Sequence, residues 1–408
     1  MEFLLDRLGN PQRDFPSVIV AGTNGKGSVT VLLESIFSAT GQYQVGSTTS
    51  PHLVRVTERI RIQNNDLSAS AWVEGVKAMQ GIVKTMEREP SIGAPTFFEL
   101  VTALAFWAFR ENDCDIAILE VGLGGRLDAT NIVTPEIAII TNIGTDHADL
   151  LGPDKPSIAK EKLGILKKRG VLITGEKDPS ILDIFQKTCL KRKAELIVSD
   201  ISKNAETIES HRHGHNITLP GISKQFDFPL VGRHQIENLS VALSAVSKLR
   251  KNGFEISQEA VMNGIMNVRW PGRLQWFYDD PPVLIDGAHN IEGLSSLVYY
   301  LKEFPMPQPC NLILGVLRGK PASKIALSLA PFAEYLTFVP PSTDRALDFK
   351  EFETQIQPTD SRWVWCDDFP SALSSTRKSA SILIAGSLYL VADFLKEHEK
   401  FKKGNPKK

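Results

Sequence analysis

The segment Val18–Ser28 carries residue types that bind nucleotide phosphates, because a β-branched stretch leads through a glycine-rich turn into a helical pattern. Backbone N–H groups of such a turn and the helix N-terminus bind an anion, a lysine reaches the outer phosphates, and a hydroxyl offers an oxygen to Mg²⁺. The spacing departs from the strict GxxxxGK[ST] pattern, yet the combination favours phosphate binding over a plain surface turn. The expected phosphate-binding residues are Thr23, Asn24, Gly25, Lys26, Gly27 and Ser28.

Two further side chains follow apolar stretches in the way that metal ligands do. Glu120 ends a buried-looking strand, where a carboxylate needs a cation or a donor, and Mg²⁺ prefers such oxygen ligands. Pairing of Glu120 with Arg126 is the alternative. His147 lies after another strand, and its residue type alone suggests a base, because histidine is an unusual ligand for Mg²⁺.

Arginines gather in two places. The segment Ser50–Leu53 follows a weak strand pattern and precedes Arg55, Arg59 and Arg61, whose guanidinium groups suit an anionic substrate; a salt-bridged exposed strand is the alternative.

Arg273 and Asp286 form a second polar pair, near the expected junction between domains. Arg273 could contact a phosphate and Asp286 a ribose or a metal, and a surface ion pair is the other interpretation.

Two further features give weaker evidence for a functional role. His211, His213 and His215 alternate and would share one face of a strand, but no fourth ligand accompanies them, so zinc binding is not favoured. Phe97 and Phe98 favour a core position, although the loop beside them leaves a stacking role open.

Apolar stretches alternate with helical patterns, which predicts an α/β protein with mainly parallel sheets and ligands at the carboxyl ends of the strands. An antiparallel excursion is expected within 211–232, and the domain boundary near Val268, giving a larger domain 1–268 and a smaller domain 269–408. The expected helices are Leu100–Arg110, Ile158–Lys167, Asn238–Lys251 and Leu388–Lys396. The expected strands are Val18–Ala21, Ile116–Val121, Ile137–Thr141, Val171–Thr174, Glu195–Val198, Val283–Ile285, Asn311–Val316, Leu336–Val339, Arg362–Cys366 and Ser381–Ala385.

Composition narrows the function classes. The 408 residues suggest two or three domains, and a net charge of −1 argues against a nucleic-acid or membrane-surface partner. The sequence shows no membrane-spanning apolar stretch and no signal peptide pattern. Four widely spaced cysteines are typical of reduced packing residues, which predicts a cytoplasmic protein.

Taken in order, the motifs resemble the folylpolyglutamate synthase/dihydrofolate synthase family of the Mur ligase superfamily, over nearly the whole chain. The resemblance implies a P-loop-type ATPase domain followed by a Rossmann-like domain that carries the glutamate-ligase function. The motifs are Ala21–Ser28, Thr49–Leu53 with Glu58–Ile60, Leu119–Asn131, Asp146 with His147, Glu161–Ile165, Pro271–Arg273, Asp286–Asn290 and Gly386–Leu388.

The resemblance implies an ATP-dependent ligase. ATP would phosphorylate a substrate carboxylate, and the amine of L-glutamate would attack the acyl phosphate, releasing phosphate. Phosphorylating a carboxylate with an anionic nucleotide requires lysine, Mg²⁺ and arginine to gather the charge. The substrates would be tetrahydrofolate or its polyglutamates, dihydropteroate, or both, and the enzyme is expected to be a monomer.

The family's site residues carry over by position. The resemblance implies that Ser28 meets one Mg²⁺, and that Ser50, Glu120 and His147 hold a second, which replaces the role of base for His147. Lys162 matches a carbamylated lysine and His289 a position near the incoming glutamate. Asn238, Arg273 and Asp286 match nucleotide contacts, the last two from the C-terminal domain. The residues that match a pterin-binding surface are Thr96, Phe97, Phe98, Glu99, Leu127, Asp128 and Ala129.

Departures from the family pattern leave alternatives. Bifunctional bacterial relatives usually have more residues before the phosphate loop, which leaves dihydropteroate use open, and Gly315–Lys320 lacks the acidic residues common in relatives. An enzyme that uses only one of the two folate substrates is therefore an alternative. A Mur ligase of cell-wall synthesis is disfavoured because the loop begins at Gly22, and a nucleotide-dependent switch would have no need of Arg273 and Asp286 in a second domain.

Overall fold

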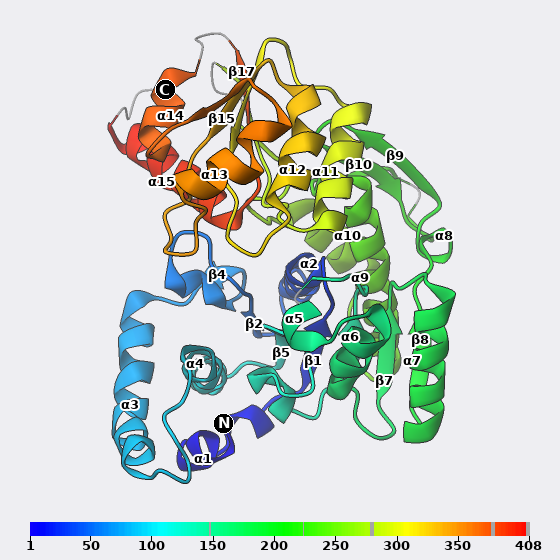
Figure 1. The fold of residues 1–408 in the computed structure, drawn as a ribbon. Helices are drawn as coiled ribbons and strands as arrows, with labels where there is room; N and C mark the ends of the chain where they lie inside the picture. Colours follow the sequence, from blue (N-terminus) through cyan, green and yellow to red (C-terminus); the bar gives the residue numbers. More distant parts are fainter. Residues whose placement is uncertain (147, 223, 278–280, 377–379, 405–408) are drawn as a thin grey trace. The chain divides into compact units, whose positions relative to one another are not determined.

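The computed structural model describes residues 1–146, 148–222, 224–277, 281–376 and 380–404 (Figure 1). The chain divides into two compact units. Unit 1 comprises Met1–Glu209, His215–Pro229 and His234–Arg269, and unit 2 comprises Ser210–Gly214, Leu230–Arg233 and Trp270–Lys408. The main passage between the units follows Arg269, next to the boundary expected at Val268, and two short earlier segments belong to unit 2.

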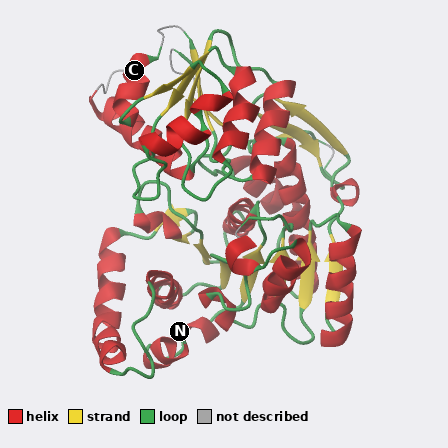
Figure 2. Cartoon of the chain, in the orientation of Figure 1, coloured by secondary structure: helices red, strands yellow, loops and turns green. Residues whose placement is uncertain are grey.

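Unit 1 is built on an eight-stranded sheet with the order β4-β3-β2-β5-β1-β6-β7-β8. The strands from β2 to β8 in this order pair in parallel, whereas β3 and β4 add antiparallel pairs at one edge. Because parallel strands need crossover connections, helices separate most of them (Figure 2). The strands are β1 (Ser17–Ala21), β2 (Val45–Thr48), β3 (Ile60–Ile62), β4 (Asn65–Asp66), β5 (Ile116–Glu120), β6 (Ile137–Ile140), β7 (Val171–Thr174) and β8 (Glu195–Val198).

The helices before β9 begin mostly where a short polar side chain can accept a backbone N–H. Ser68 caps α3, Thr96 caps α4, and Asp154 and Asp178 cap α6 and α7. The helices are α1 (Glu2–Arg7), α2 (Lys26–Ser38), α3 (Ala69–Arg88), α4 (Phe97–Glu111), α5 (Ala148–Leu151), α6 (Lys155–Lys162), α7 (Pro179–Arg192) and α8 (Ile201–Asn204). The helix expected over Ile158–Lys167 ends earlier, because a 3₁₀ turn at Leu163–Ile165 follows α6.

A small sheet of order β11-β10-β9 is the predicted antiparallel excursion, formed by β9 (Thr207–His211), β10 (Gly214–Thr218) and β11 (Phe226–Phe228). The expectation that three histidines share one strand face was wrong. His211 ends β9, His213 lies in the turn, and His215 begins the next strand, buried against Phe228 with ring centroids 5.9 Å apart. Within the described ranges, no group of three or more His, Cys, Asp and Glu residues is placed to hold a metal ion.

Two helices, α9 (Arg233–Lys251) and α10 (Gln258–Asn267), follow this sheet, and α10 packs against α2. Unit 2 then forms a six-stranded sheet of order β12-β13-β17-β14-β15-β16, parallel except for the edge strand β12. Its elements are β12 (Gln275–Phe277), β13 (Val283–Ile285), α11 (Ile291–Glu303), β14 (Cys310–Leu314), α12 (Ala322–Leu329), β15 (Tyr335–Phe338), α13 (Phe349–Gln355), β16 (Trp363–Trp365), α14 (Phe369–Ser375), β17 (Ser381–Ala385) and α15 (Leu388–Gly404).

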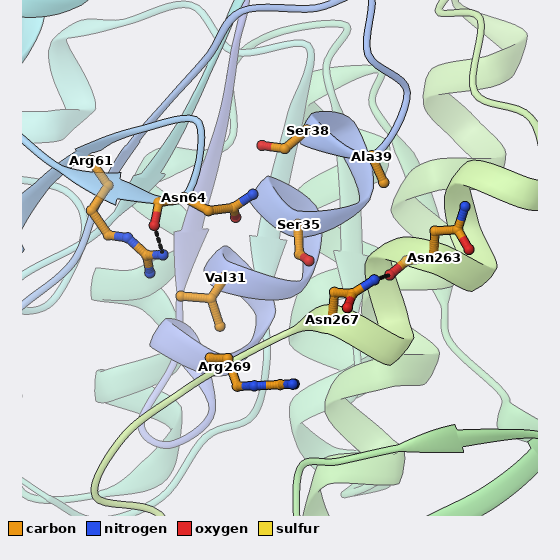
Figure 3. Close-up of a pocket in the computed structure, with 9 residues that line it drawn as sticks. All are labelled: Val31, Ser35, Ser38, Ala39, Arg61, Asn64, Asn263, Asn267 and Arg269. Atoms are coloured by element: carbon orange, nitrogen blue, oxygen red, sulfur yellow. Dashed lines mark hydrogen bonds between the residues drawn. The ribbon is translucent and has the colours of Figure 1, made fainter.

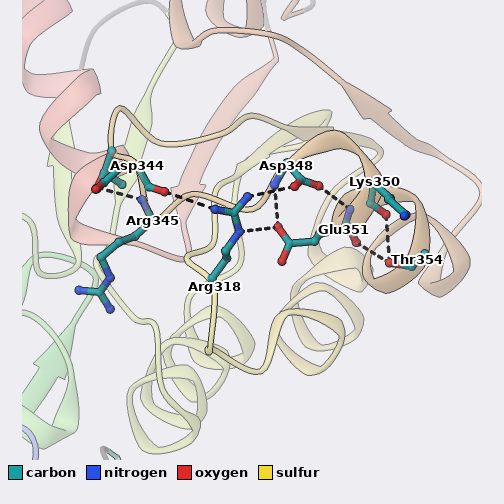
Figure 4. Close-up of polar contacts among 8 residues, drawn as sticks. Arg318, Asp344, Arg345, Asp348, Lys350, Glu351 and Thr354 are labelled. Carbon is teal, nitrogen blue, oxygen red and sulfur yellow. Dashed lines mark hydrogen bonds and ion pairs between the residues drawn. The ribbon is translucent and has the colours of Figure 1, made fainter.

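The loop after β14 is fixed by one arginine. Arg318 donates to Glu351 through Nε (2.8 Å) and to Asp348 through Nη2 (3.0 Å), and these two acids also form the capping box of α13 (Figure 4). This loop therefore takes its acidic partners from a helix later in the chain. In the described part of the chain, no helix has the length and apolar character needed to cross a membrane.

Candidate functional site

The phosphate loop joins the end of β1 to the start of α2, as the glycine pattern predicted. Gly25 is the N-cap of α2 with φ of 83°, and a Cβ there would lie 2.2 Å from Asn238 Oδ1. Gly22 has φ of 149°, and a Cβ there would lie 1.8 Å from Thr141 Oγ1. Side chains can occupy neither position without a clash, which explains the glycines and brings Asn238 of α9 against the loop.

The residues after β6 hold this loop in place. Asn24 N–H donates to Asn142 Oδ1 (3.0 Å), and Thr141 Oγ1 donates to the Asn24 carbonyl (2.6 Å). Gly144 N–H donates to Thr23 Oγ1 (2.8 Å), so the Thr23 hydroxyl is used in fixing the loop. Sequence reasoning missed Thr141; its signal was its place at the end of the strand next to β1 in the parallel sheet.

Two lysines from distant parts of unit 1 meet on one carbonyl. Lys26 Nζ donates to the carbonyls of Gly22 (3.2 Å) and Thr23 (3.1 Å), and Lys162 Nζ donates to the same Gly22 carbonyl at 2.8 Å. Lys162 is only 4% exposed. Burial, and then the charge of Lys26, lowers the pKa of Lys162 to about 7. The loop thus concentrates two amines where an anion would bind.

Glu120 ends β5 as a buried carboxylate, and its Oε2 accepts the Ser50 N–H at 2.8 Å. The alternative that Glu120 pairs with Arg126 was wrong, because Arg126 forms its ion pair with Glu161. The expected metal ligands Ser50 and Glu120 are therefore neighbours, and Ser28 lies buried in the first turn of α2. His147, the other expected ligand, lies outside the described residues.

Two of the arginines near β3, Arg59 and Arg61, have different partners. Arg59 Nε donates to His52 Nδ1 (2.8 Å), and its guanidinium lies 5.3 Å from the ring centroid of Phe97. Arg61 instead pairs with Glu34, whose side chain has no exposed surface (Nη1–Oε2, 3.4 Å). One arginine thus faces the exposed Phe97, and the other is held inside the unit.

The residues expected to form a pterin-binding surface divide into structural and exposed ones. Thr96 and Glu99 form the capping box of α4, and Phe98 packs on Gly122, where a Cβ would lie 2.6 Å from the ring. Phe97 and Leu127 are 57% and 80% exposed, respectively, which is unusual for large apolar side chains.

The last two members of that set are held by local hydrogen bonds. Asp128 accepts from the N–H groups of Gly122 (3.1 Å) and Leu123 (3.0 Å), and Ala129 is buried beside it. Asp128 therefore shapes the loop after β5.

The remaining predicted residues lie in unit 2. Asp286 accepts N–H groups from Leu274 and Ala288, both at 2.8 Å, and it is 6% exposed, so the alternative of a surface ion pair was wrong. Burial raises the pKa of Asp286, and the charge of Arg273 opposes that rise. His289 Nδ1 lies 2.8 Å from the Gly287 carbonyl. Unit 2 therefore brings its three predicted residues into one short region around the end of β13.

The family model and the two relatives described next are similar to most of this chain. The family model of the Mur ligase middle domain matches residues 20–246. Dihydrofolate synthase/folylpolyglutamate synthase of Bacillus subtilis is 32% identical over 97% of this chain and 93% of its own length. The Escherichia coli protein of the same name is 34% identical over 91% of this chain and 84% of its own length.

Solved structures give the same result for the fold. Folylpolyglutamate synthase of Mycobacterium tuberculosis complexed with ADP and AMPPCP superposes with a TM-score of 0.88 at 30% identity, over 97% of this chain and 94% of that one. An E. coli protein in complex with DHPP and ADP gives a TM-score of 0.82 at 30% identity, over 98% and 92% of the two chains.

Proposed function

The chain belongs to the folylpolyglutamate synthase/dihydrofolate synthase family, within the Mur ligase fold, and on this premise we propose that it is an ATP-dependent ligase. The reaction adds L-glutamate to tetrahydrofolate or its polyglutamates, to dihydropteroate, or to both. The observation that carries the proposal is the convergence of Lys26 and Lys162 on the Gly22 carbonyl, in a loop that only glycines can form.

The chemistry follows from the charges that must meet. A substrate carboxylate oxygen attacks the γ-phosphorus of ATP, and the bond to ADP breaks. The glutamate amine then attacks the acyl carbon, loses a proton, and expels phosphate through a tetrahedral intermediate. In this proposal the loop N–H groups and Lys26 offset the repulsion between the carboxylate and the triphosphate, which bulk water would screen less specifically.

Ser28, Ser50 and Glu120 carry oxygen atoms of the kind that Mg²⁺ takes, which supports a magnesium requirement for this reaction. Mg²⁺ takes one or two carboxylates with hydroxyl, phosphate and water oxygens, and Glu120 is a buried carboxylate beside Ser50. Ser28 would serve one ion, and Ser50, Glu120 and His147 a second. Bound there, Mg²⁺ would supply positive charge at the phosphates and the reacting carboxylate.

Lys162 is proposed to carry a carbamate in the working enzyme. A carbamate forms from a neutral amine and CO₂ with loss of a proton, and a lysine with a pKa of about 7 has a large neutral fraction at neutral pH. We expect Lys162→Ala to lose most ligase activity and short carboxylates to restore part of it, measured as the rate of ADP release. Unchanged kinetics in this variant would remove the carbamate role.

The residues of unit 2 enter as proposals of the same kind. Arg273 and Asp286 are assigned to nucleotide contacts, as is Asn238 of unit 1, and His289 is assigned to the incoming glutamate. The proposed pterin-binding surface would use the exposed side chains of Phe97 and Leu127. We also propose that the enzyme works as a monomer in the cytoplasm, and sedimentation of the purified chain tests its oligomeric state.

The experiment that tests the function is ADP release with Mg²⁺, ATP and L-glutamate, offering dihydropteroate and tetrahydrofolate in parallel. Turnover with both substrates means a bifunctional enzyme, and turnover with one identifies which synthase it is. ATP hydrolysis that ignores glutamate would favour a nucleotide switch instead.

Replacing Lys26 tests the phosphate assignment separately. Lys26→Ala should abolish ligation and leave the fold intact, because the side chain contributes only two hydrogen bonds to the ligand-free loop. Circular dichroism checks the fold, and near-normal ADP release by the folded variant would refute the assignment.

A further inference from the structure

A polar cavity lies along α2, beyond the phosphate loop. Its volume is about 290 Å³, and all its lining residues belong to unit 1 (Figure 3). Val31 and Ser38 lie 5 and 12 residues after Lys26, which is roughly 8 and 18 Å along a helix axis. The cavity is therefore displaced from the turn that meets the phosphates. Its lining residues are Val31, Ser35, Ser38, Ala39, Arg61, Asn64, Asn263, Asn267 and Arg269.

A buried ion pair supports one side of the cavity. Glu34 Oε1 accepts the Asn64 N–H at 2.9 Å, and Arg61 Nη2 donates to the Asn64 carbonyl at 2.8 Å. Arg61 Nη1 lies 3.4 Å from Glu34 Oε2, so the buried carboxylate is matched by one guanidinium. Burial raises the pKa of Asp66, and the nearby charge of Arg61 opposes that rise.

The lining offers more donors than the protein uses. Among the described residues, the Arg61 Nε and the Ser38 hydroxyl are buried without a hydrogen-bond partner. Arg269 Nη1 donates to the carbonyls of Val268 (2.9 Å) and Met266 (3.4 Å), and the ion pairs of the described chain do not include Arg269. No Asp or Glu lines the cavity.

We propose that this cavity binds a small anion with carboxylate or phosphate oxygens. Arg269 adds a positive charge that no lining carboxylate offsets, and two lining residues, Ser38 and Arg61, carry buried donor atoms without a hydrogen-bond partner. Three asparagines add carboxamide groups that can complete the ligand's hydrogen bonds. The volume of about 290 Å³ lies at the lower end of the range of about 300–1,000 Å³ typical of ligand pockets, which leaves room for a small anion.

The proposal is independent of the ligase assignment, because it uses none of the residues assigned to ATP, folate or glutamate. The test must separate this cavity from the phosphate loop, which would also attract phosphate. Titration calorimetry on the full chain is therefore done with Mg²⁺ and AMPPCP at saturation. The two probes are inorganic phosphate and glutarate, a dicarboxylate without the amine needed for ligation.

Binding of phosphate, of glutarate or of both supports the proposal when Arg269→Ala weakens it, and the probe that binds identifies the anion chemistry. Arg269→Ala should weaken the binding by about tenfold or more, the loss expected for a charge-assisted hydrogen bond. Ser38→Ala, which removes an unpartnered hydroxyl and no charge, should weaken it severalfold while the fold is retained.

Arg88→Ala is the matched control, because it removes the same charge from the exposed end of α3. We expect it to bind both probes as the unaltered chain does. The absence of binding by either probe would overturn the proposal. Binding that Arg269→Ala and Ser38→Ala leave unchanged would also overturn it, because the anion would then occupy another place.

Discussion

Replacing Lys162 with Met should stabilise the folded protein at neutral pH even though it removes a proposed catalytic group. Lys162 is 4% exposed, and burial with the nearby charge of Lys26 lowers its pKa from 10.5 to about 7. Between these two values the unfolded chain binds more protons than the folded one, so stability rises with pH in this window. Below pH 7 the whole penalty of burying the ammonium group is present.

The size of the effect follows from the two pKa values. One pKa unit corresponds to about 1.4 kcal/mol, so the ionisable group lowers the free energy of unfolding by about 4 kcal/mol at pH 7 and about 2 kcal/mol at pH 9. Losing the hydrogen bond from Nζ to the Gly22 carbonyl removes about 1 kcal/mol, nearly independently of pH. Lys162→Met should therefore be more stable by about 3 kcal/mol at pH 7, and its advantage should shrink by about 2 kcal/mol at pH 9.

The assay is urea unfolding of both proteins between pH 7 and 9 in CO₂-free buffer, since a carbamate would alter the ionisation of the lysine. Lys168→Met is the control, because Lys168 is exposed in the same segment and its replacement should change stability by no more than about 0.5 kcal/mol at either pH. Parallel stability curves for Lys162→Met and the unaltered protein would refute the reasoning, because a titrating buried lysine must make them converge.

Two further predictions concern the surroundings of the loop. Gly25→Ala should lose about 1–3 kcal/mol of stability and most ADP release, because the added Cβ would lie 2.2 Å from Asn238 Oδ1. Gly41→Ala is the control for backbone strain, because Gly41 also has a positive φ but nothing lies within 4 Å of its Cβ position. Equal losses in thermal unfolding of the two variants would contradict the clash. Arg61→Met should lower the free energy of unfolding in urea by about 3–5 kcal/mol, because it leaves Glu34 buried without its cation. Adding Glu34→Gln to this variant should recover part of the lost stability. A loss below about 1 kcal/mol for the single variant would count against a buried pair.

The sequence predicted most of the parallel sheets well. The predicted bounds of β7, β8, β13 and β17 agree with the structure. β7, β13 and β17 are largely buried and read as short continuous apolar stretches between turn residues, whereas the edge strand β8 is only partly buried. It missed β3 and β4, which are too short to show a pattern, and α3, in which the apolar Val73 and Val76 are exposed.

Residues that lie close together in the sequence form the part of the candidate site that could be predicted from residue type and spacing. The glycines, Lys26 and Ser28 all lie within residues 22–28, so their residue types and spacing suffice to indicate a phosphate loop. Glu34 escaped attention, although a single acid inside the apolar stretch Val31–Phe37 was a signal that it needs a buried partner.

The sequence by itself determined the alternation of most strands and helices, the phosphate loop and the family to which the chain belongs. Only the tertiary structure decided which charges meet: Lys162 reaches the Gly22 carbonyl, and Arg126 selects Glu161 in place of Glu120. The physical reason is that periodicity and turn chemistry act over a few residues. Contacts between strand ends, in contrast, depend on how crossover connections order the strands in the sheet, and on which polar groups burial then forces to find partners.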